Sequence, residues 1–369
     1  MRSICALVGL TLACAGCPPA QDPDTPRRRA TANDNERPYM PRRGQSAVEA
    51  DLRPGKSLVK SGQWRAALKA FWAVAKKYPT DSRPHYYVGV CLINLNQAKA
   101  AIAAYRRAVK HKPHFFELWN NLGTALLVAG KATQAVGPLE RAVKLQPKDY
   151  SGWLNLGLAY NEAGLLPKAA RALERSSEIM PSNADTHLAL ADVLRKLGRY
   201  VAALKRYDET VKRRPGDLYA HLAAVMTLTR LGREADALQR LATAAKLKPK
   251  SARIPAVRGM VLMRFARWAK AEAAFREAVK RKPGSPGFTL MIGRAQLGRK
   301  QYRKAVVTLK RAGALAKGRL RTIDFYLAEA YRKQGQCRRA KPLYKKFVTA
   351  VKRGKLATQA AKHLKSCRR

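Results

Sequence analysis

The chain has 369 residues, of which 47% are hydrophobic, and its 74 Lys and Arg residues exceed its 24 Asp and Glu residues, giving a formal net charge of +50. The length is greater than that of one usual compact core, so two domains or a repeat array are expected, and the apolar fraction excludes a wholly disordered chain. So large a positive charge favours an acidic ligand, an anionic polymer or an anionic membrane surface as partner.

The N-terminus has the layout of a secretory signal. In residues 1–17 a basic residue precedes an apolar stretch and then small residues. Ala15-Gly16-Cys17 resembles the bacterial lipobox, in which the Cys is lipidated, although Cys14 stands where Leu is usual. We therefore predict lipidation at Cys17 and a lipid-anchored protein of the bacterial cell envelope that faces the periplasm or the exterior. A plain cleaved signal and modification of Cys14 are the alternatives.

A polar segment follows the signal. Residues 18–47 are dense in Pro, Asp, Asn and Arg and lack apolar periodicity, so they are expected to be a disordered tether. After residue 17 no apolar run approaches the roughly 18 residues that a transmembrane helix needs. The sequence therefore predicts anchoring by a lipid instead of by a spanning helix.

A period of 34 residues organises the rest of the chain. Prolines recur at this interval, and an alanine lies 12 residues before each of them. A large apolar or aromatic residue lies between the two, as Phe71 and Tyr105 do. A fixed period of this length indicates a solenoid of helix pairs, with Gly or Asn near the end of each first helix and Pro beyond the second. The prolines are Pro79, Pro113, Pro147, Pro181, Pro215, Pro249 and Pro283.

This pattern resembles the tetratricopeptide repeat. Residues 153–160, WLNLGLAY, match the family's W-x₂-L-G-x₂-Y motif position by position. The resemblance implies an all-α, right-handed superhelical solenoid of about nine repeats over residues 48–354. Residues 355–369 are expected to form a capping helix, as such arrays need. The repeats begin near residues 48, 82, 116, 150, 184, 218, 252, 286 and 321, and positions are counted from these starts.

No residue pattern indicates catalysis or a cofactor. His85, His187 and His221 all occupy position 4, where other repeats have Trp119 and Trp153, so we interpret them as packing residues. After residue 17 the sequence has no phosphate-binding glycine loop, HExxH, GxSxG or CxxC motif. We expect a protein without enzymatic activity, cofactor or metal.

The resemblance places a concave groove on the first helix of each repeat, at positions 2, 5, 6, 9, 12 and 13. Asn120, Asn121 and Asn155 fall there, like the asparagine ladders with which some family members bind a peptide main chain. Because position 6 also tolerates Asn without a function, contact with a ligand and simple packing are both open.

The groove positions of later repeats have a different chemistry. They carry methionines, which suit varied apolar partners, beside a line of cations at position 13. Packing and solvated charge are the alternative interpretation. The residues are Lys196, Met226, Arg230, Met260, Met263, Arg264 and Met291.

Two cysteines near the C-terminus are candidates for a disulfide. Counted back and forth from the connection near residue 354, Cys337 and Cys367 come to about the same level of antiparallel helices. An oxidising compartment would preserve such a bond, and two free thiols are the alternative. Cys91, at position 10 of a first helix, is expected to be buried.

These observations predict a non-enzymatic, envelope-tethered scaffold that binds a protein or peptide segment in the groove. The expected segment is amphipathic and acidic. The alternative is that the basic face binds an anionic polymer or membrane surface, such as lipopolysaccharide or an acidic polysaccharide. Nucleic acid is disfavoured by the export signal and by the lack of a reader motif.

Overall fold

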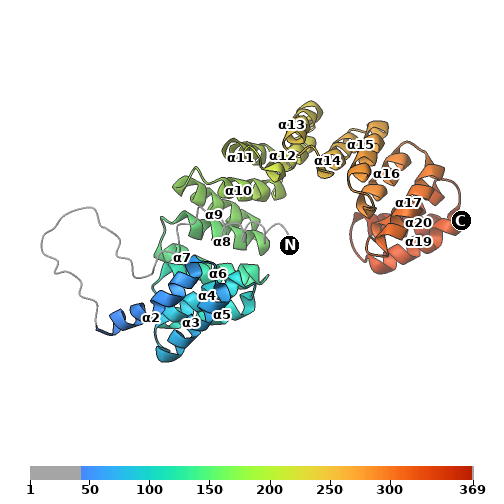
Figure 1. Ribbon diagram of the computed structural model, residues 1–369. Coiled ribbons are helices and arrows are strands. Elements are labelled where there is room, and N and C mark those ends of the chain that lie inside the picture. The colour runs from blue at the N-terminus through green and yellow to red at the C-terminus, as the bar shows by residue number, and fades with distance from the viewer. Residues whose placement is uncertain (1–42, 368–369) are drawn as a thin grey trace. The chain divides into compact units, whose positions relative to one another are not determined.

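The computed structural model describes residues 43–367, with side chains from residue 47 onward. This part of the chain forms only helices, labelled α2 to α20 (Figure 1). The predicted signal, Cys17 and the tether as far as residue 42 lie outside the described residues. The helices are α2 Arg43–Lys60, α3 Trp64–Lys77, α4 Ser82–Asn94, α5 Ala98–His111, α6 Phe116–Val128, α7 Ala132–Leu145, α8 Tyr150–Glu162, α9 Leu166–Ile179, α10 Ala184–Lys196, α11 Tyr200–Arg213, α12 Leu218–Arg230, α13 Glu234–Leu247, α14 Arg253–Arg264, α15 Trp268–Arg281, α16 Pro286–Gly298, α17 Tyr302–Ala316, α18 Thr322–Arg332, α19 Cys337–Ala350 and α20 Lys355–Ser366.

The helices follow one another as nine pairs in the described chain, from α2–α3 to α18–α19, with α20 after the last pair. Within each unit the two helices of a pair pack together, as α4 does with α5, and the second helix packs against the first helix of the next pair, as α5 does with α6. The predicted all-α repeat fold is confirmed.

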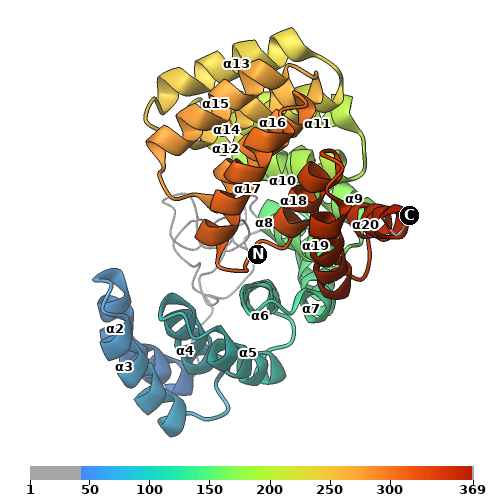
Figure 2. The same ribbon diagram turned by 90° about the vertical axis from the view of Figure 1, so that its right-hand side faces the viewer.

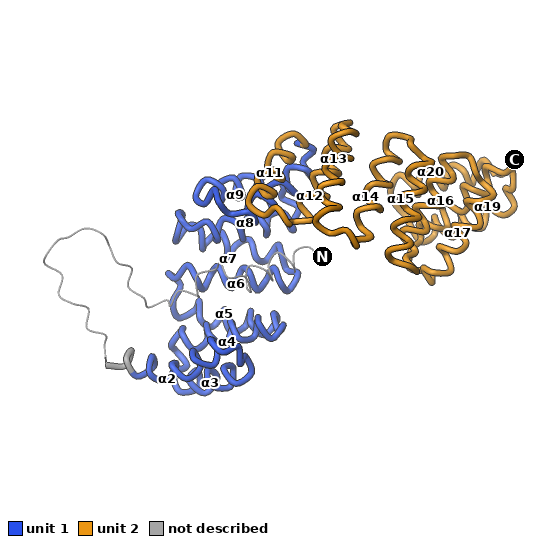
Figure 3. Tube along the Cα trace, turned by 45° about the horizontal axis from the view of Figure 1, so that its top comes forward, with its two compact units in different colours: residues 1–199 blue, residues 200–369 orange. Residues whose placement is uncertain are grey.

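The chain divides into two compact units (Figure 3). Unit 1 is Met1–Arg199 and contains α2 to α10, while unit 2 is Tyr200–Arg369 and contains α11 to α20. No helix of the described residues is both long and apolar enough to cross a membrane.

The predicted tether overlaps the first helix. The expected boundary was residue 47, whereas α2 begins at Arg43. Val48 and Leu52 are one turn apart and both are buried, so they fix this helix against its neighbour. The polar residues just before them extend the helix by one turn, a continuation that their composition alone does not reveal.

In six of the nine pairs a glycine of the first helix faces a large buried residue of the second. Gly157 in α8 faces Leu173 in α9, and a Cβ on this glycine would lie 2.5 Å from the Leu173 Cγ atom. In unit 2, Gly259 faces Phe275 in the same way, at 2.7 Å. Leu173 and Phe275 are fully buried. Glycine at position 8 therefore lets the two helices approach closely enough to bury position 24.

The turn between the two helices of a pair needs a left-handed backbone. At position 15 the φ angle is +72° for Gly130 and +79° for Gly232. Asn96, Ala266 and Lys300 adopt the same region at the equivalent place, with φ of +60°, +56° and +59°. A residue with a Cβ is strained there, so unit 2 carries two strained turns at Ala266 and Lys300.

Position 4 makes one recurring hydrogen bond. The indole N–H of Trp119 donates to the carbonyl of Pro113 at 2.8 Å, and that of Trp153 donates to Pro147 at 2.9 Å. A histidine Nε2 takes the same role where His replaces Trp. The pairs are His85 with Pro79 at 3.0 Å, His187 with Pro181 at 2.8 Å and His221 with Pro215 at 2.9 Å. The interpretation of these histidines as packing residues is confirmed.

Candidate functional site

The first helices of neighbouring repeats touch one another as well as their own partners. Such contacts join α6 to α8 and α8 to α10 in unit 1, and α12 to α14 and α16 to α18 in unit 2. We call the surface that these helices form in each unit its first-helix face. Every residue predicted for the groove lies on one of these two faces.

The first-helix face of unit 2 lacks acidic residues over three successive repeats. Neither α12 nor α14 nor α16 contains an Asp or a Glu. Apolar residues and arginines occupy most of the positions predicted for the groove. Because Arg230, Arg264 and Arg294 form no ion pair with a carboxylate of the described residues, they are available to a negatively charged partner.

The four predicted methionines all lie on this face and are all half-buried. Met226 and Met260 pack against the core cluster built around Val225 and Val261. Met260 also packs against a second cluster around Phe275, as do Met263 and Met291. The methionines therefore contribute to the core and still present part of their surface to solvent.

Arg230 and Arg264 are exposed and are the last residues of α12 and α14. Neither forms an ion pair with a carboxylate of the described residues. A cation at a helix C-terminus is stabilised by the helix dipole, by about 0.3–1 kcal/mol. This local effect explains why arginine is tolerated there, and it leaves both guanidinium groups free to bind.

Sequence reasoning missed Arg294, which extends this face. Its guanidinium stacks over the ring of Tyr326, 4.7 Å from the centroid, and donates to the Met291 Sδ atom at 3.3 Å. Arg294 lies at position 9 of its repeat, the position that Met226 and Met260 occupy in theirs. That shared position was the available signal, but the stacking depends on a residue of the following repeat.

Unit 1 presents amides in place of methionines. The Asn155 Nδ2 donates to the Asn120 Oδ1 at 3.0 Å, so two of the predicted ladder residues bind each other. Asn121 is half-buried, and its side chain has no hydrogen-bond partner among the described residues. Lys196, predicted in line with Arg230 and Arg264, lies in unit 1 and donates to the Asn161 Oδ1 at 2.7 Å.

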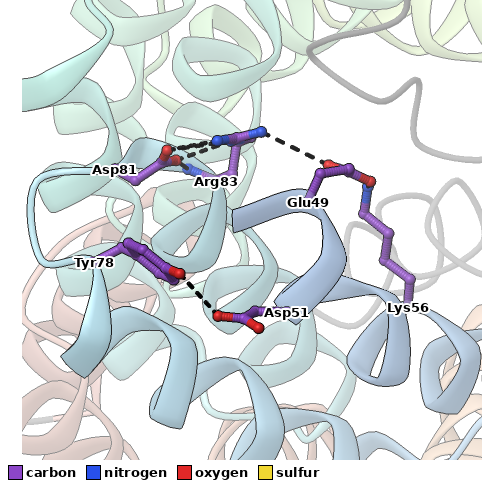
Figure 4. A network of polar contacts seen from close by, with 6 residues as sticks. All are labelled: Glu49, Asp51, Lys56, Tyr78, Asp81 and Arg83. Atoms are coloured by element: carbon purple, nitrogen blue, oxygen red, sulfur yellow. Dashed lines mark hydrogen bonds and ion pairs between the residues drawn. The ribbon is translucent and has the colours of Figure 1, made fainter. Parts of the chain in front are cut away.

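A polar network at the start of unit 1 was also missed (Figure 4). Arg83 is 4% exposed, and its guanidinium donates to Asp81 at 2.8 Å and lies 3.7 Å from Glu49. Glu49 also pairs with Lys56 at 2.6 Å. Burial raises the pKa of Asp81, but the hydrogen bonds from Arg83 outweigh this effect and lower it. The network joins α2 to α4, and its charges satisfy one another.

The C-terminal end of unit 2 is closed by α20, which packs against α19 (Figure 2). Cys337 and Cys367 form a disulfide with their Cα atoms 5.4 Å apart. Cys91, also as expected, is buried, and burial raises the pKa of its thiol to about 12.

The carboxylate of Glu329, in α18, contacts the closing helix α20. The Glu329 Oε1 contacts the His363 Nδ1 at 2.5 Å and accepts from the Tyr344 hydroxyl, while Arg332 pairs with Oε2 at 2.9 Å. Burial raises the pKa of Glu329, but the hydrogen bonds from Arg332 and Tyr344 outweigh it and hold the pKa below its usual value.

A hollow of about 400 Å³ in unit 2 is lined by residues of α11, α12 and α13, where Asp208 pairs with Arg240 and Asp236 pairs with Arg233, each at 2.5 Å. These charges neutralise one another. Within residues 43–367, no group of three or more His, Cys, Asp or Glu side chains is arranged to hold a metal ion.

Comparison with known proteins agrees with this architecture. Sequence profiles of the tetratricopeptide repeat match most of the array, and one of them alone covers more than half of the chain. None of the curated proteins matches significantly. The matched residues are 52–114, 120–184 and 257–318 for the first profile, 160–223 and 194–260 for the second, and 324–350 for the third.

Many solved structures are similar in fold, including the following two. A chain of the APC/C hetero-tetramer Cut9–Hcn1 superposes with a TM-score of 0.50 at 16% identity, over 82% of this chain and 58% of that one. A tetratricopeptide repeat protein from Parabacteroides merdae ATCC 43184 gives a TM-score of 0.51 at 14% identity, over 68% of this chain and 99% of that one. The chain thus spans little more than half of the first relative, and the likeness concerns the fold.

Proposed function

Because the chain belongs to the tetratricopeptide repeat family, whose members bind protein or peptide partners, we propose that it is a non-enzymatic scaffold and that the first-helix face of unit 2 is its binding surface. The partner is an amphipathic protein segment in which acidic residues flank apolar anchors. The observation that carries this proposal is the absence of any carboxylate from α12, α14 and α16.

The apolar part of the recognition comes from the half-buried methionines. Met226, Met260 and Met291 are already held by the core at one side, so a partner that covers their exposed side buries more apolar area at little entropic cost. Each Å² of apolar surface removed from water contributes about 25 cal/mol. The flexible thioether side chains suit partners of varied shape.

The charged part of the recognition comes from Arg230, Arg264 and Arg294. The first two have no acidic partner among the described residues, so a partner's carboxylates displace only water. Such pairs at the rim of an interface set orientation and association rate more than affinity. Binding should therefore weaken, but persist, as salt is raised.

The scaffold is proposed to be tethered to the bacterial envelope through a lipid on Cys17. The support is the apolar stretch that precedes Ala15-Gly16-Cys17. Substituting Cys17→Ser should move the protein from the membrane to the soluble fraction and abolish labelling by a fatty-acid probe. Unchanged labelling of this variant would disprove the anchor.

In-cell photo-crosslinking tests the binding surface. A photoreactive residue is placed at Met291, or at Asn121 as the matched control, since both occupy position 6 of their repeats. The proposal predicts a discrete protein adduct at residue 291 that survives washes of increasing salt, and a weaker adduct or none at residue 121. Equal adducts at both sites, or recovery only of anionic polysaccharide that elutes with salt, would overturn it.

A further inference from the structure

A stripe of exposed basic residues runs along α3. Arg65, Lys69, Trp72 and Lys76 are spaced by four, three and four residues, so they share one side of this helix. All four are exposed. The opposite side of the helix carries Ala67 and Phe71, which are fully buried. The stripe therefore points away from the core of unit 1.

The second helix of the next repeat, α5, carries a similar stripe. In α5 the equivalent positions, 34 residues later, hold Lys99, Ala103, Arg106 and Lys110, and all are exposed. We call the exposed residues of these two stripes the α3–α5 basic face. The equivalent residues of α7 and α9 include Glu140, Glu174 and Glu178, so within unit 1 the purely basic character is confined to the first two repeats.

The cations of this face are not neutralised by other described residues of the protein. Residues 43–114 contain only three carboxylates, and each is engaged elsewhere. Glu49 pairs with Lys56, Asp51 pairs with Lys77, and Asp81 pairs with Arg83. No residue of the α3–α5 basic face forms an ion pair with a carboxylate of the described chain.

Helix stability does not account for this arrangement. A cation in the last turn complements the helix dipole, which explains Lys76 and Lys110. Arg65 and Lys99, however, lie in the first turns of α3 and α5, where a positive charge opposes the dipole. An external negative charge gives these two residues a favourable partner.

Trp72 distinguishes a bilayer from a soluble polyanion. Its side chain is 37% exposed, and it is the only aromatic among the exposed large apolar side chains of the described residues. It lies between Lys69 and Lys76 on the stripe. A polyanion requires only the cations, whereas an indole ring flanked by basic residues is suited to the headgroup region of a bilayer.

We propose that the α3–α5 basic face lies against a bilayer surface rich in anionic phospholipid, with the Trp72 ring in the headgroup region. This surface is separate from the first-helix face of unit 2, so the two proposals stand or fall independently. α3 is the second helix of the first repeat after Cys17. Arg43, where α2 begins, follows that cysteine by 26 residues. A lipid on Cys17 would strengthen the contact without being required for it.

Vesicle binding tests the proposal with the full chain carrying Cys14→Ser and Cys17→Ser, so that no acyl chain contributes. Vesicles contain brominated phosphatidylcholine alone or mixed with phosphatidylglycerol. The readout is the quenching of Trp72, taken as the difference between this protein and its Trp72→Phe variant. The expected result is quenching by the phosphatidylglycerol vesicles that falls as salt is raised.

The decisive variant is Arg65→Glu/Lys69→Glu/Lys76→Glu. It should lower affinity for the phosphatidylglycerol vesicles by about 100-fold or more. The matched control, Lys212→Glu/Lys246→Glu/Lys280→Glu, changes the net charge equally at exposed positions on α11, α13 and α15 and should bind as the parent does. Equal losses in both variants, equal quenching by neutral vesicles, or binding of soluble acidic polysaccharide without Trp72 quenching would each overturn the proposal.

Discussion

The first-helix faces of the two units use one scaffold for different chemistry. In unit 1, Asn155 binds Asn120 and Lys196 binds Asn161, so polar side chains satisfy one another. In unit 2, Arg230 and Arg264 meet no carboxylate of the described residues, and half-buried methionines lie beside them. The repeat fold therefore determines the position of each side chain on the face, while the residue type at that position differs from one repeat to another.

The largest expected effect tests whether the scaffold is the same in both units. Leu173 in unit 1 and Leu309 in unit 2 occupy position 24, are fully buried and face Gly157 and Gly293. Leu173→Ala and Leu309→Ala should each destabilise the surrounding helices by about 2–5 kcal/mol, because each leaves a cavity.

Hydrogen exchange of the local amides is the suitable measurement, since long arrays do not unfold in one step. Similar losses of protection in the two units are expected. If one substitution left amide protection unchanged and the other greatly reduced it, the two units would not be equivalent.

A second prediction concerns the closed end that distinguishes unit 2. The Cys337–Cys367 disulfide closes a loop of 30 residues and should stabilise this end by about 2–4 kcal/mol. Cys337→Ser/Cys367→Ser should speed amide exchange in α19 and α20 and leave unit 1 unchanged.

Mass spectrometry of non-reduced peptides checks the bond directly. Cys91 is an internal control, because burial raises the pKa of its thiol to about 12 and makes it a poor nucleophile in the native protein. Alkylation of both Cys337 and Cys367 in the native protein would show that the bond is absent.

Acid should weaken the same end of unit 2. The pKa of Glu329 is lower in the folded protein than its usual 4.5, so its ionised form stabilises the fold. That stability is fully present above pH 4.5 and is lost as the pH falls through the folded-state pKa.

Glu329→Gln should therefore cost about 1–3 kcal/mol at neutral pH, and the difference from the parent should shrink in acid. Amide exchange in α18 to α20, followed against pH, measures it. A stability difference between Glu329→Gln and the parent that does not change with pH would contradict this role of the carboxylate.

The smallest effect concerns the turns. Unit 1 has Gly130 and Gly164 at position 15, whereas unit 2 has Ala266 in the same left-handed conformation. Ala266→Gly should stabilise unit 2 by about 0.5–1 kcal/mol, because it relieves strain that exceeds the entropy cost of glycine. Gly232→Ala is the reverse control and should destabilise by a similar amount. Local amide protection that moves in the same direction for both variants would refute the assignment.

Much of the fold follows from spacing along the chain. The 34-residue period predicts the helix pairs, and the equivalence of His187 to Trp153 predicts a packing role that the hydrogen bonds to Pro181 and Pro147 explain. Helical rise alone also predicts that Cys337 and Cys367 lie at about the same height along two antiparallel helices. These features depend on backbone geometry, which the repeat constrains.

The parts that escaped prediction depend on side-chain conformation across repeats. Arg294 stacks on Tyr326 of the next repeat, and Arg83 reaches Glu49 of the previous one. The 34-residue period does not specify which rotamer such a long side chain adopts. The bond between Asn155 and Asn120 is of the same kind, since it joins position 6 of one repeat to position 5 of the repeat before it.

The most direct test of the central claim compares position 13 in the two units. A photo-crosslinked partner segment is identified, synthesised and titrated against the protein, against Arg230→Glu/Arg264→Glu in unit 2, and against Lys60→Glu/Lys196→Glu in unit 1. Both double variants change the charge equally at exposed residues. The account predicts that affinity falls at least about tenfold, or about 1.4 kcal/mol, only when the unit 2 arginines are reversed. Equal affinity of the two double variants would contradict it.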